Sequence, residues 1–116
     1  MKPRSKYGNI RVDGFDSKSE RDRYQELVLL ERAGKIQGLK RQVKFVLYGQ
    51  NGEALLIRSN GYPNGRRASY TADFTYHENG KRIIEDRKGM ETATFKLKRA
   101  IMESMGFSIR ITRARR

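Results

Sequence analysis

One dipeptide, Asn79-Gly80, constrains the fold of this chain more than any other feature. Asn-Gly is the strongest short signal for a two-residue β-hairpin turn, because a type I′ turn needs positive φ at both central positions. If the turn forms there, Glu78 faces Lys81, and the numbers of any two residues that face each other across the hairpin add up to the same value. Asp73 is then predicted to lie directly across from Asp86.

The same register places three charged groups on one face of the hairpin, Asp73, Asp86 and Lys88, because side chains alternate between faces along a strand. Opposed like charges destabilise a sheet, so two carboxylates with Cβ atoms about 5 Å apart call for a compensating cation. Mg²⁺ and Mn²⁺ prefer oxygen ligands and are typically held by one or two carboxylates, water and phosphate oxygens. Two alternatives stay open: a hairpin slipped by one residue, or a solvated face on which Lys81, Arg82 and Lys88 neutralise the aspartates.

Charge and cysteine content narrow the partner and the ligands. The 116 residues carry a formal net charge of +13, which is typical of a nucleic-acid-binding protein. The chain has no cysteine and one histidine, His77, so thiolate and histidine-rich metal sites are excluded and any metal must be held by carboxylates.

The length and the ends of the chain suit one soluble domain. The segment MKPRSKYGN lacks the apolar core of a signal peptide, and no long apolar run or strongly basic amphipathic helix follows. We therefore expect a cytoplasmic protein with no membrane partner. Without repeats or a low-complexity linker, residues 1–116 are predicted to form a single domain with a basic arm at each end.

Local signals predict the element order α-β-β-β-α-β, with an extra small hairpin between the first strand and the strand that carries Asp73. Ser17 and Glu20 have the capping-box spacing, and Gly34 suits the end of the same helix. The other predicted elements are strands at 43–48 and 54–57, a polar loop at 59–67, the hairpin, a helix at 92–105 and a strand at 107–112. The second helix repeats apolar residues on one face, which predicts core packing for Leu97, Ala100, Ile101 and Met105.

Glu20 has two interpretations. Its carboxylate can complete the capping box by reaching back to the backbone N–H of Ser17. At 100° per residue, however, Glu20 lies on the same stripe as Tyr24 and Leu27, which points it toward the sheet. An inward carboxylate at a helix N-terminus could join the acidic pair of the hairpin, because that end of a helix tolerates negative charge.

Four segments in order carry a family resemblance: KYGN (6–9), FDSKSE (15–20), YTADF (70–74) and EDRKG (85–89). The strand with Asp73, the hairpin, and the strand with Asp86 and Lys88 resemble the PD-(D/E)XK (restriction-endonuclease-like) nuclease superfamily. The four segments are similar to those of small phage and prophage proteins in that superfamily. The resemblance implies an α/β (α+β) fold with a single αβββαβ core, in which two helices flank a mixed central sheet.

Two departures from the family pattern affect the site. Ala72 stands where the superfamily often has proline, and Glu85 beside Asp86 leaves two ways to align the second motif. Choosing Glu85 would put Arg87 at the lysine position and place the carboxylate on the face opposite Asp73. The hairpin register therefore favours Asp86.

The resemblance implies a role for each site residue. Asp73 and Asp86 would bind Mg²⁺, for which Mn²⁺ would substitute, and the backbone carbonyl of Arg87 would be a further ligand. Lys88 would orient the attacking water or stabilise negative charge on the phosphate, although a salt bridge to Asp86 is its alternative role. Glu20 would be the helix-borne carboxylate that Holliday-junction-resolvase-like members use.

Other cations and aromatic residues carry weaker predictions. The basic side chains are expected to contact the DNA backbone. Two roles stay open for Tyr7, Tyr62 and Tyr70, which are stacking on bases and packing in the core. The residues predicted to bind DNA are Lys6, Tyr7, Arg66, Arg67, Lys96, Lys98 and Arg99, with Arg113, Arg115 and Arg116 at the C-terminus.

Together these features predict a Mg²⁺-dependent endodeoxyribonuclease that hydrolyses DNA phosphodiester bonds. FDSKSE is similar to the first helix of Holliday-junction resolvases, which implies that the substrate is branched DNA. The expected process is Holliday-junction cleavage during phage recombination or replication, in the cytoplasm of a bacterial host. A two-fold symmetric junction would require a homodimer. The alternative is a non-catalytic nucleic-acid-binding module that retains the nuclease fold, but a polyanion-binding protein gains nothing from buried carboxylates.

Overall fold

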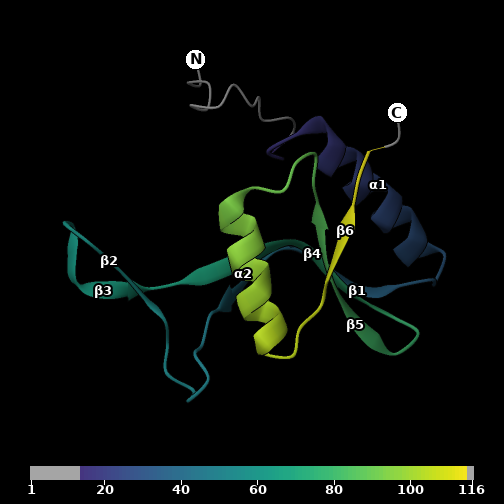
Figure 1. Cartoon of the computed structure of the whole chain (residues 1–116). Helices are drawn as coiled ribbons and strands as arrows, with labels where there is room; N and C mark the ends of the chain where they lie inside the picture. Colours follow the sequence, from purple (N-terminus) through teal and green to yellow (C-terminus); the bar gives the residue numbers. More distant parts are fainter. Residues whose placement is uncertain (1–13, 115–116) are drawn as a thin grey trace.

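The computed structural model describes residues 14–114, so Lys6, Tyr7, Arg115 and Arg116 lie outside the described residues. Within residues 14–114, two helices and six strands form an α+β fold, as predicted (Figure 1). In chain order they are α1 Lys18–Arg32, β1 Gln37–Val46, β2 Leu56–Ser59, β3 Tyr62–Arg67, β4 Ser69–Glu78, β5 Lys81–Arg87, α2 Ala93–Ser104 and β6 Ile109–Thr112.

The central sheet is mixed, with the strand order β1-β4-β5-β6. β4 pairs antiparallel with both β1 and β5, whereas β6 runs parallel to β5 after the α2 crossover. β2 and β3 form a separate two-stranded sheet. Without this extra hairpin the order is αβββαβ, which confirms the predicted core. No helix among residues 14–114 is long and apolar enough to cross a membrane.

The β4–β5 hairpin has the predicted turn and register. Asn79 and Gly80 have φ of 52° and 77°, as the two central positions of a type I′ turn require. The pairing runs from Glu78↔Lys81 to Phe74↔Glu85 without a shift. The slipped register is therefore excluded.

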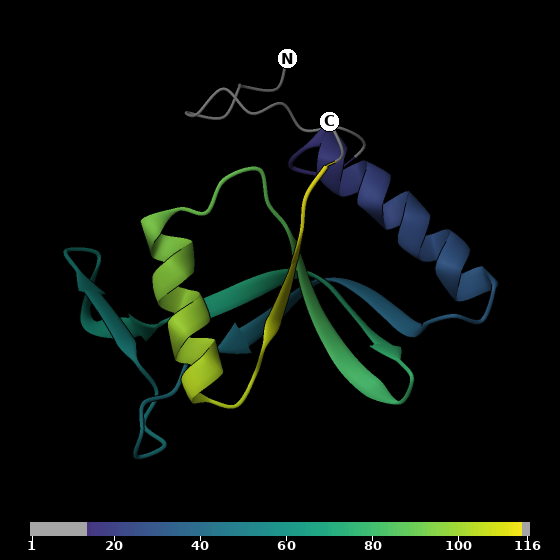
Figure 2. The same cartoon turned by 45° about the vertical axis from the view of Figure 1, so that its right-hand side comes forward.

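Both helices begin and end where local signals place them. The Ser17 hydroxyl accepts a hydrogen bond from the Glu20 backbone N–H (3.1 Å), and Gly34, at φ +75°, follows the last residues of α1. Thr92 caps α2 in the same way through the backbone N–H of Phe95 (3.1 Å), and Gly106 follows its end at φ +95°. Figures 1 and 2 show the two helices on either side of β6.

Two buried clusters divide the core between the helices. The α1 cluster contains Leu27 and, from β4, Phe74 and Tyr76. The α2 cluster contains Phe95 and Met102 of the helix together with Tyr70 and Ala72 of β4, among others. β4 thus passes from one cluster to the other, and Asp73 lies at the junction.

Two predictions about the elements were wrong. Residues 62–67, predicted as part of a loop, form β3, in which Arg66 and Arg67 pair with Ile57 and Leu56. The side chains of β3 do not pack in the core, so its polar, glycine-containing sequence lacks the hydrophobic pattern by which a strand is predicted. The strands predicted on either side of Asn51-Gly52 share only the isolated bridge Tyr48↔Ala54, and β1 begins earlier, at Gln37.

The buried face of α2 also differs from the predicted one. Leu97 is 64% exposed and Ala100 is exposed as well. Phe95 and Met102, seven residues apart, set the buried stripe instead, with Ile101 and Met105 at its edge. Periodicity alone fits several neighbouring stripes on a short helix, and packing against Tyr70 and Ala72 selects this one.

Candidate functional site

Side chains bridge β4 and β5 beyond the last backbone pair, Phe74↔Glu85. The backbone N–H of Asp73 donates to Asp86 Oδ1 (3.2 Å), and the backbone N–H of Arg87 donates to Asp73 Oδ2 (2.9 Å). Each carboxylate thus binds the opposite strand. The two predicted carboxylates are brought together in the end of the hairpin remote from its turn.

Burial and mutual repulsion dominate the electrostatics of this pair. Asp86 is 1% exposed. Burial first, and the negative charge of Asp86 second, raise the pKa of Asp73 from 3.8 to about 8, although the Arg87 N–H opposes the shift. The charge of Glu20 raises it further. Asp73 is therefore mostly protonated at neutral pH when no cation is bound.

Tyr70 holds the second carboxylate, that of Asp86. Its hydroxyl donates a hydrogen bond to Asp86 Oδ2, and its ring is 3% exposed in the α2 cluster. Burial and the Asp86 carboxylate raise the pKa of Tyr70 well above its ordinary value, so the phenol remains a donor. Burial also excludes the base-stacking role that the sequence left open for Tyr70.

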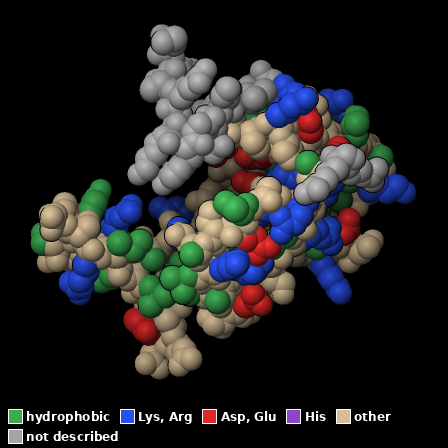
Figure 3. Space-filling model, turned by 45° about the horizontal axis from the view of Figure 1, so that its top comes forward, with side chains coloured by type: hydrophobic (Ala, Val, Ile, Leu, Met, Phe, Trp, Pro, Cys, Tyr) green, Lys and Arg blue, Asp and Glu red, His purple; other side chains and the backbone are tan. Residues whose placement is uncertain are grey.

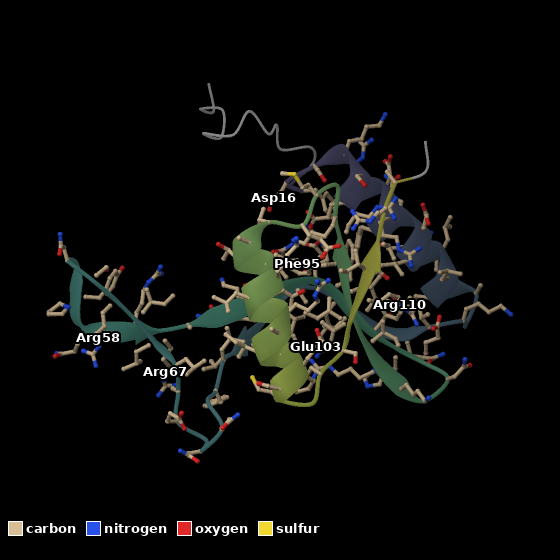
Figure 4. The ribbon with its side chains drawn as sticks, in the orientation of Figure 1. Asp16, Arg58, Arg67, Phe95, Glu103 and Arg110 are labelled. Atoms are coloured by element: carbon tan, nitrogen blue, oxygen red, sulfur yellow. The ribbon has the colours of Figure 1, made fainter. Side chains whose placement is uncertain are left out.

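Lys88 supplies the positive charge at the edge of the pair. Its Nζ lies 3.9 Å from Asp86 Oδ2 and 4.3 Å from the centroid of the Phe95 ring. Its backbone N–H donates to Thr112 O of β6 (2.9 Å), which fixes the end of β5. Figure 4 places Phe95 near the start of α2, so Lys88 lies between the carboxylates and that helix. The side chain is 27% exposed and is accessible to a ligand.

The structure buries Glu20 against the sheet, where it is 4% exposed. Its Oε1 accepts a hydrogen bond from the Gln42 side chain (2.9 Å). Burial, followed by the charge of Asp16, raises the pKa of Glu20, whereas Arg41 and Gln42 lower it. The carboxylate is thus directed inward while its backbone completes the Ser17 cap.

Gln42 joins Glu20 to the strand next to Asp73. The β1–β4 pairs Arg41↔Phe74 and Val43↔Ala72 leave Gln42 across from Asp73, and Gln42 has a positive φ of 52°. Positive φ is uncommon for a non-glycine residue, and such conformations cluster at functional sites.

A divalent cation fits the chemistry of the two aspartates. Their donor atoms are all oxygens, and one or two carboxylates are what Mg²⁺ usually takes from a protein. Within residues 14–114, however, no group of three or more Asp, Glu, His or Cys side chains is arranged to hold a metal ion. The structure therefore pairs Asp73 with Asp86, and Glu20 acts on Asp73 through its charge.

Glu85 and Asp86 are adjacent in sequence but contact different parts of the molecule. Glu85 is fully buried and receives two hydrogen bonds from Arg23 of α1 (2.7 and 3.0 Å). Tyr76 and Thr112 donate to it as well (2.5 and 3.0 Å). Although burial raises it, the pKa of Glu85 is lowered overall by these donors. Glu85 therefore ties α1 to the sheet.

Arg87 makes a second tie between α1 and the sheet. Its guanidinium Nε donates to the Ser19 hydroxyl in the first turn of α1 (2.8 Å), close to Glu20 in sequence. Its backbone N–H binds Asp73, so one residue connects the helix start with a site carboxylate.

The predicted DNA-binding cations differ in their surroundings. Arg66 and Arg67 of β3 and Lys96 of α2 are exposed, whereas Lys98 is half-buried. Arg99 forms a salt bridge with Glu91 (2.8 Å), which also pairs with Arg113 (2.7 Å). Tyr62 is 50% exposed, and the guanidinium of Arg66 lies 5.4 Å from the centroid of its ring.

Comparison with known proteins adds a family without an assigned activity. A family described as "Protein of unknown function (DUF1064)" matches residues 4–115. The chain belongs to the DUF1064 family. Comparisons with curated proteins and with solved structures found no match. The function of this DUF1064 member must therefore be argued from its site.

Two site residues, Tyr70 and Gln42, were missed by sequence reasoning. The sequence leaves stacking or core packing open for Tyr70, but the hydrogen bond of Tyr70 to Asp86 depends on how β4 and β5 diverge. The position of Gln42 depends on the β1–β4 register, for which the sequence has no turn signal. Neither contact leaves a local pattern, because each joins residues that only the sheet brings together.

Proposed function

We propose that the chain is an endonuclease that hydrolyses DNA phosphodiester bonds with a divalent cation, Mg²⁺ or Mn²⁺, held by Asp73 and Asp86. One observation carries this proposal: two carboxylates face each other in the diverging end of a hairpin, inside a chain of net charge +13. The negative charge of this pair opposes the approach of a phosphate. A cation bound between them removes that repulsion and attracts the phosphate.

The residues around the pair have separate tasks. The bound cation would supply Lewis-acid stabilisation of a phosphate oxygen and a more acidic water. Tyr70 and the backbone N–H of Arg87 orient the two carboxylates toward each other. Lys88, within 3.9 Å of Asp86, stabilises negative charge that develops on the phosphate. Glu20 adds negative charge to the same neighbourhood and favours retention of the cation.

A non-catalytic DNA-binding module is the second candidate. The observation in its favour is that Asp73 N, Arg87 N and the Tyr70 hydroxyl already donate hydrogen bonds to the carboxylates. Such donors can satisfy a buried acidic pair without a metal. This candidate predicts DNA binding without cleavage under every metal condition.

Nicking of supercoiled plasmid DNA distinguishes the two candidates. The protein is incubated with Mg²⁺, Mn²⁺ or EDTA, with Asp86→Asn as the inactive control. We expect nicking with either metal, none with EDTA, and none by the variant. Cleavage by Asp86→Asn equal to that of the wild type would exclude this site.

The narrower form of the proposal is cleavage of branched DNA by a homodimer. It rests on the resemblance of residues 15–20 to the first helix of resolvases. Labelled four-way junctions and linear duplexes of equal length are compared in the same assay, with sedimentation to measure the oligomeric state. Faster cleavage of the junction by a dimer supports this form, whereas equal rates leave a general nuclease.

A further inference from the structure

The β2–β3 hairpin, residues 56–67 and hereafter the arm, stands apart from the rest of the fold. All four residues of β2 and five of the six in β3 are exposed, the sixth being Gly65. Figures 1 and 2 both show the arm extending past α2, away from the four-stranded sheet. Its side chains therefore contribute no core packing.

The base of the arm is nevertheless fixed to the strands that carry the site. Leu47 N donates to Ala68 O (3.0 Å), Ala68 N to Leu55 O (2.8 Å), and Leu55 N to Leu47 O (3.0 Å). A single residue, Ala68, separates β3 from β4. The arm is thus a continuation of the strand that holds Asp73.

The arm carries basic and apolar side chains but no acidic ones. Arg58, Arg66 and Arg67 lie on it, and no Asp or Glu occurs between Glu53 and Asp73. The apolar side chains of the arm are exposed as well: Leu56 to 47%, Ile57 to 40% and Tyr62 to 50%. Figure 3 shows cationic and hydrophobic side chains together on the lobe that the arm forms, and Figure 4 places Arg58 farther from α2 than Arg67.

We propose that the arm inserts into the DNA major groove beside the site, with its arginines on phosphates and its exposed apolar side chains on base edges. A two-stranded β-ribbon fits this groove, and thymine methyl groups there accept apolar contacts. The inference rests on the proposed function only for the identity of the neighbouring site as a cleavage site.

The length of the strand sets where the arm meets the DNA. Arg67 and Asp73 are six positions apart, which is at most about 20 Å of extended chain. A duplex rises 3.4 Å per base pair, so the base of the arm reaches phosphates up to about six base pairs from the bond at the site. The tip reaches farther along the same groove.

Charge decides between DNA and a second copy of the chain as the partner. A symmetric contact between two arms would bring their arginines together without any carboxylate on either arm to pair them. DNA phosphates neutralise the same groups and release counterions. The observations therefore favour DNA.

The salt dependence of DNA binding tests the proposal. Fluorescence anisotropy of a labelled 30-base-pair duplex is measured over a range of NaCl concentrations in EDTA, so that cleavage plays no part. The arm variant replaces Arg58, Arg66 and Arg67 with Gln, and the charge-matched control replaces the exposed Arg32, Lys35 and Lys40 with Gln. Melting temperatures of all three proteins confirm that each is folded.

We expect the arm variant to lower the slope of log K against log salt by about 2–3, since each phosphate contact contributes about 0.9. The control should keep the wild-type slope. Equal slopes for the arm variant and the wild type would overturn the proposal. So would a wild-type dimer that Leu56→Ser/Ile57→Ser converts to a monomer while the slope is unchanged, because the arm would then be a protein interface.

The two proposals fail separately. If the wild type does not nick DNA with Mg²⁺ or Mn²⁺ but the arm variant still loses slope, the cleavage site is wrong and the arm is supported. If nicking occurs and the slopes are equal, the nuclease is supported and the arm inference is overturned.

Discussion

At the scale of single residues, Asp73 links the site to the stability of the fold. Its pKa is about 8 in the folded protein, against an ordinary 3.8 in an unfolded chain. Between these values the folded state binds more protons than the unfolded state, so this group makes the free energy of unfolding fall as pH rises. The loss is complete only above pH 8.

We therefore expect the metal-free protein to lose melting temperature between pH 5 and pH 8. Asp73→Asn should remove this loss and melt about 4 °C or more above the wild type at pH 8 in EDTA. Mn²⁺ at pH 8 should raise the melting temperature of the wild type and leave the variant unchanged. Differential scanning calorimetry measures all three effects, and parallel pH curves for the two proteins would contradict the assignment of Asp73.

Adjacent carboxylates give the sharpest comparison of structural and catalytic roles. Glu85→Gln leaves the half-buried guanidinium of Arg23 without its anionic partner in the sheet, so we expect a loss of about 2–4 kcal/mol in the free energy of unfolding. Below its melting temperature this variant should still nick plasmid DNA. Asp86→Asn should be folded and inactive. Urea denaturation and the nicking assay test both, and an inactive but folded Glu85→Gln with an active Asp86→Asn would reverse the assignment.

One substitution, Glu20→Gln, distinguishes the two roles proposed for this residue, a helix cap and a carboxylate of the site. Gln accepts a hydrogen bond from Gln42 as Glu does, so Glu20→Gln should melt close to the wild type. The lost charge should slow Mg²⁺-dependent cleavage about 100-fold, as when an electrostatic catalytic group is removed. Single-turnover cleavage measures the rate. A near wild-type rate would reduce Glu20 to a structural role and remove the main support for a resolvase-like site.

The positions of site residues could be predicted from the sequence where they depend only on neighbouring residues. Asn79-Gly80 fixed the register that brings Asp73 and Asp86 together, because the turn needs no information from the rest of the chain. Tyr70 and Gln42 escaped, because their partners are 16 and 22 residues away in sequence. Contacts of that kind depend on how strands diverge and pair.

At the scale of elements, the type I′ turn is what keeps the site in register. Gly80 has φ +77° and open space around its Cα, so Gly80→Ala meets no steric neighbour but must adopt a left-handed backbone. We expect a cost of about 1–2 kcal/mol in the free energy of unfolding. Gly61→Ala in the arm is the matched control, since its surroundings are equally open and it lacks a positive φ. Urea denaturation of both variants tests this, and equal stabilities would show that the turn is not a constraint.

Elements with a hydrophobic pattern were predicted better than those without one. The helices carry caps and a stripe, and β4 and β5 are buried strands beside a turn signal. β3 reads YPNGRR, without alternation, because none of its side chains faces a core. The same exposure that hid β3 from the sequence pattern is what makes the arm available to a partner.

At the scale of the whole molecule, a strongly cationic chain surrounds a small acidic pair. The charge of +13 attracts DNA at long range, while the pair opposes the last approach of a phosphate. At pH 7 Asp73 is mostly protonated, because its pKa is about 8, so it adds little to the negative charge of the pair. Replacing Asp86 removes only the second cause of this raised pKa, because burial is the largest cause and remains. Asp73 then carries part of the charge that Asp86 carried, and the site as a whole becomes less negative.

The two aspartates should therefore affect DNA affinity non-additively. In EDTA at pH 7, we expect Asp73→Asn to bind a duplex about as tightly as the wild type, and Asp86→Asn to bind with an affinity between those of the wild type and the double variant. The double variant, which has no charge at the site, should bind several-fold more tightly, as expected for one unit charge a few ångströms from a phosphate. Its salt slope should be unchanged, because the carboxylates make no phosphate contacts. Fluorescence anisotropy measures these affinities, and adding Mg²⁺ should tighten binding by the wild type but not by the double variant. A double variant that binds no more tightly than the single variants would show that the pair does not face the DNA.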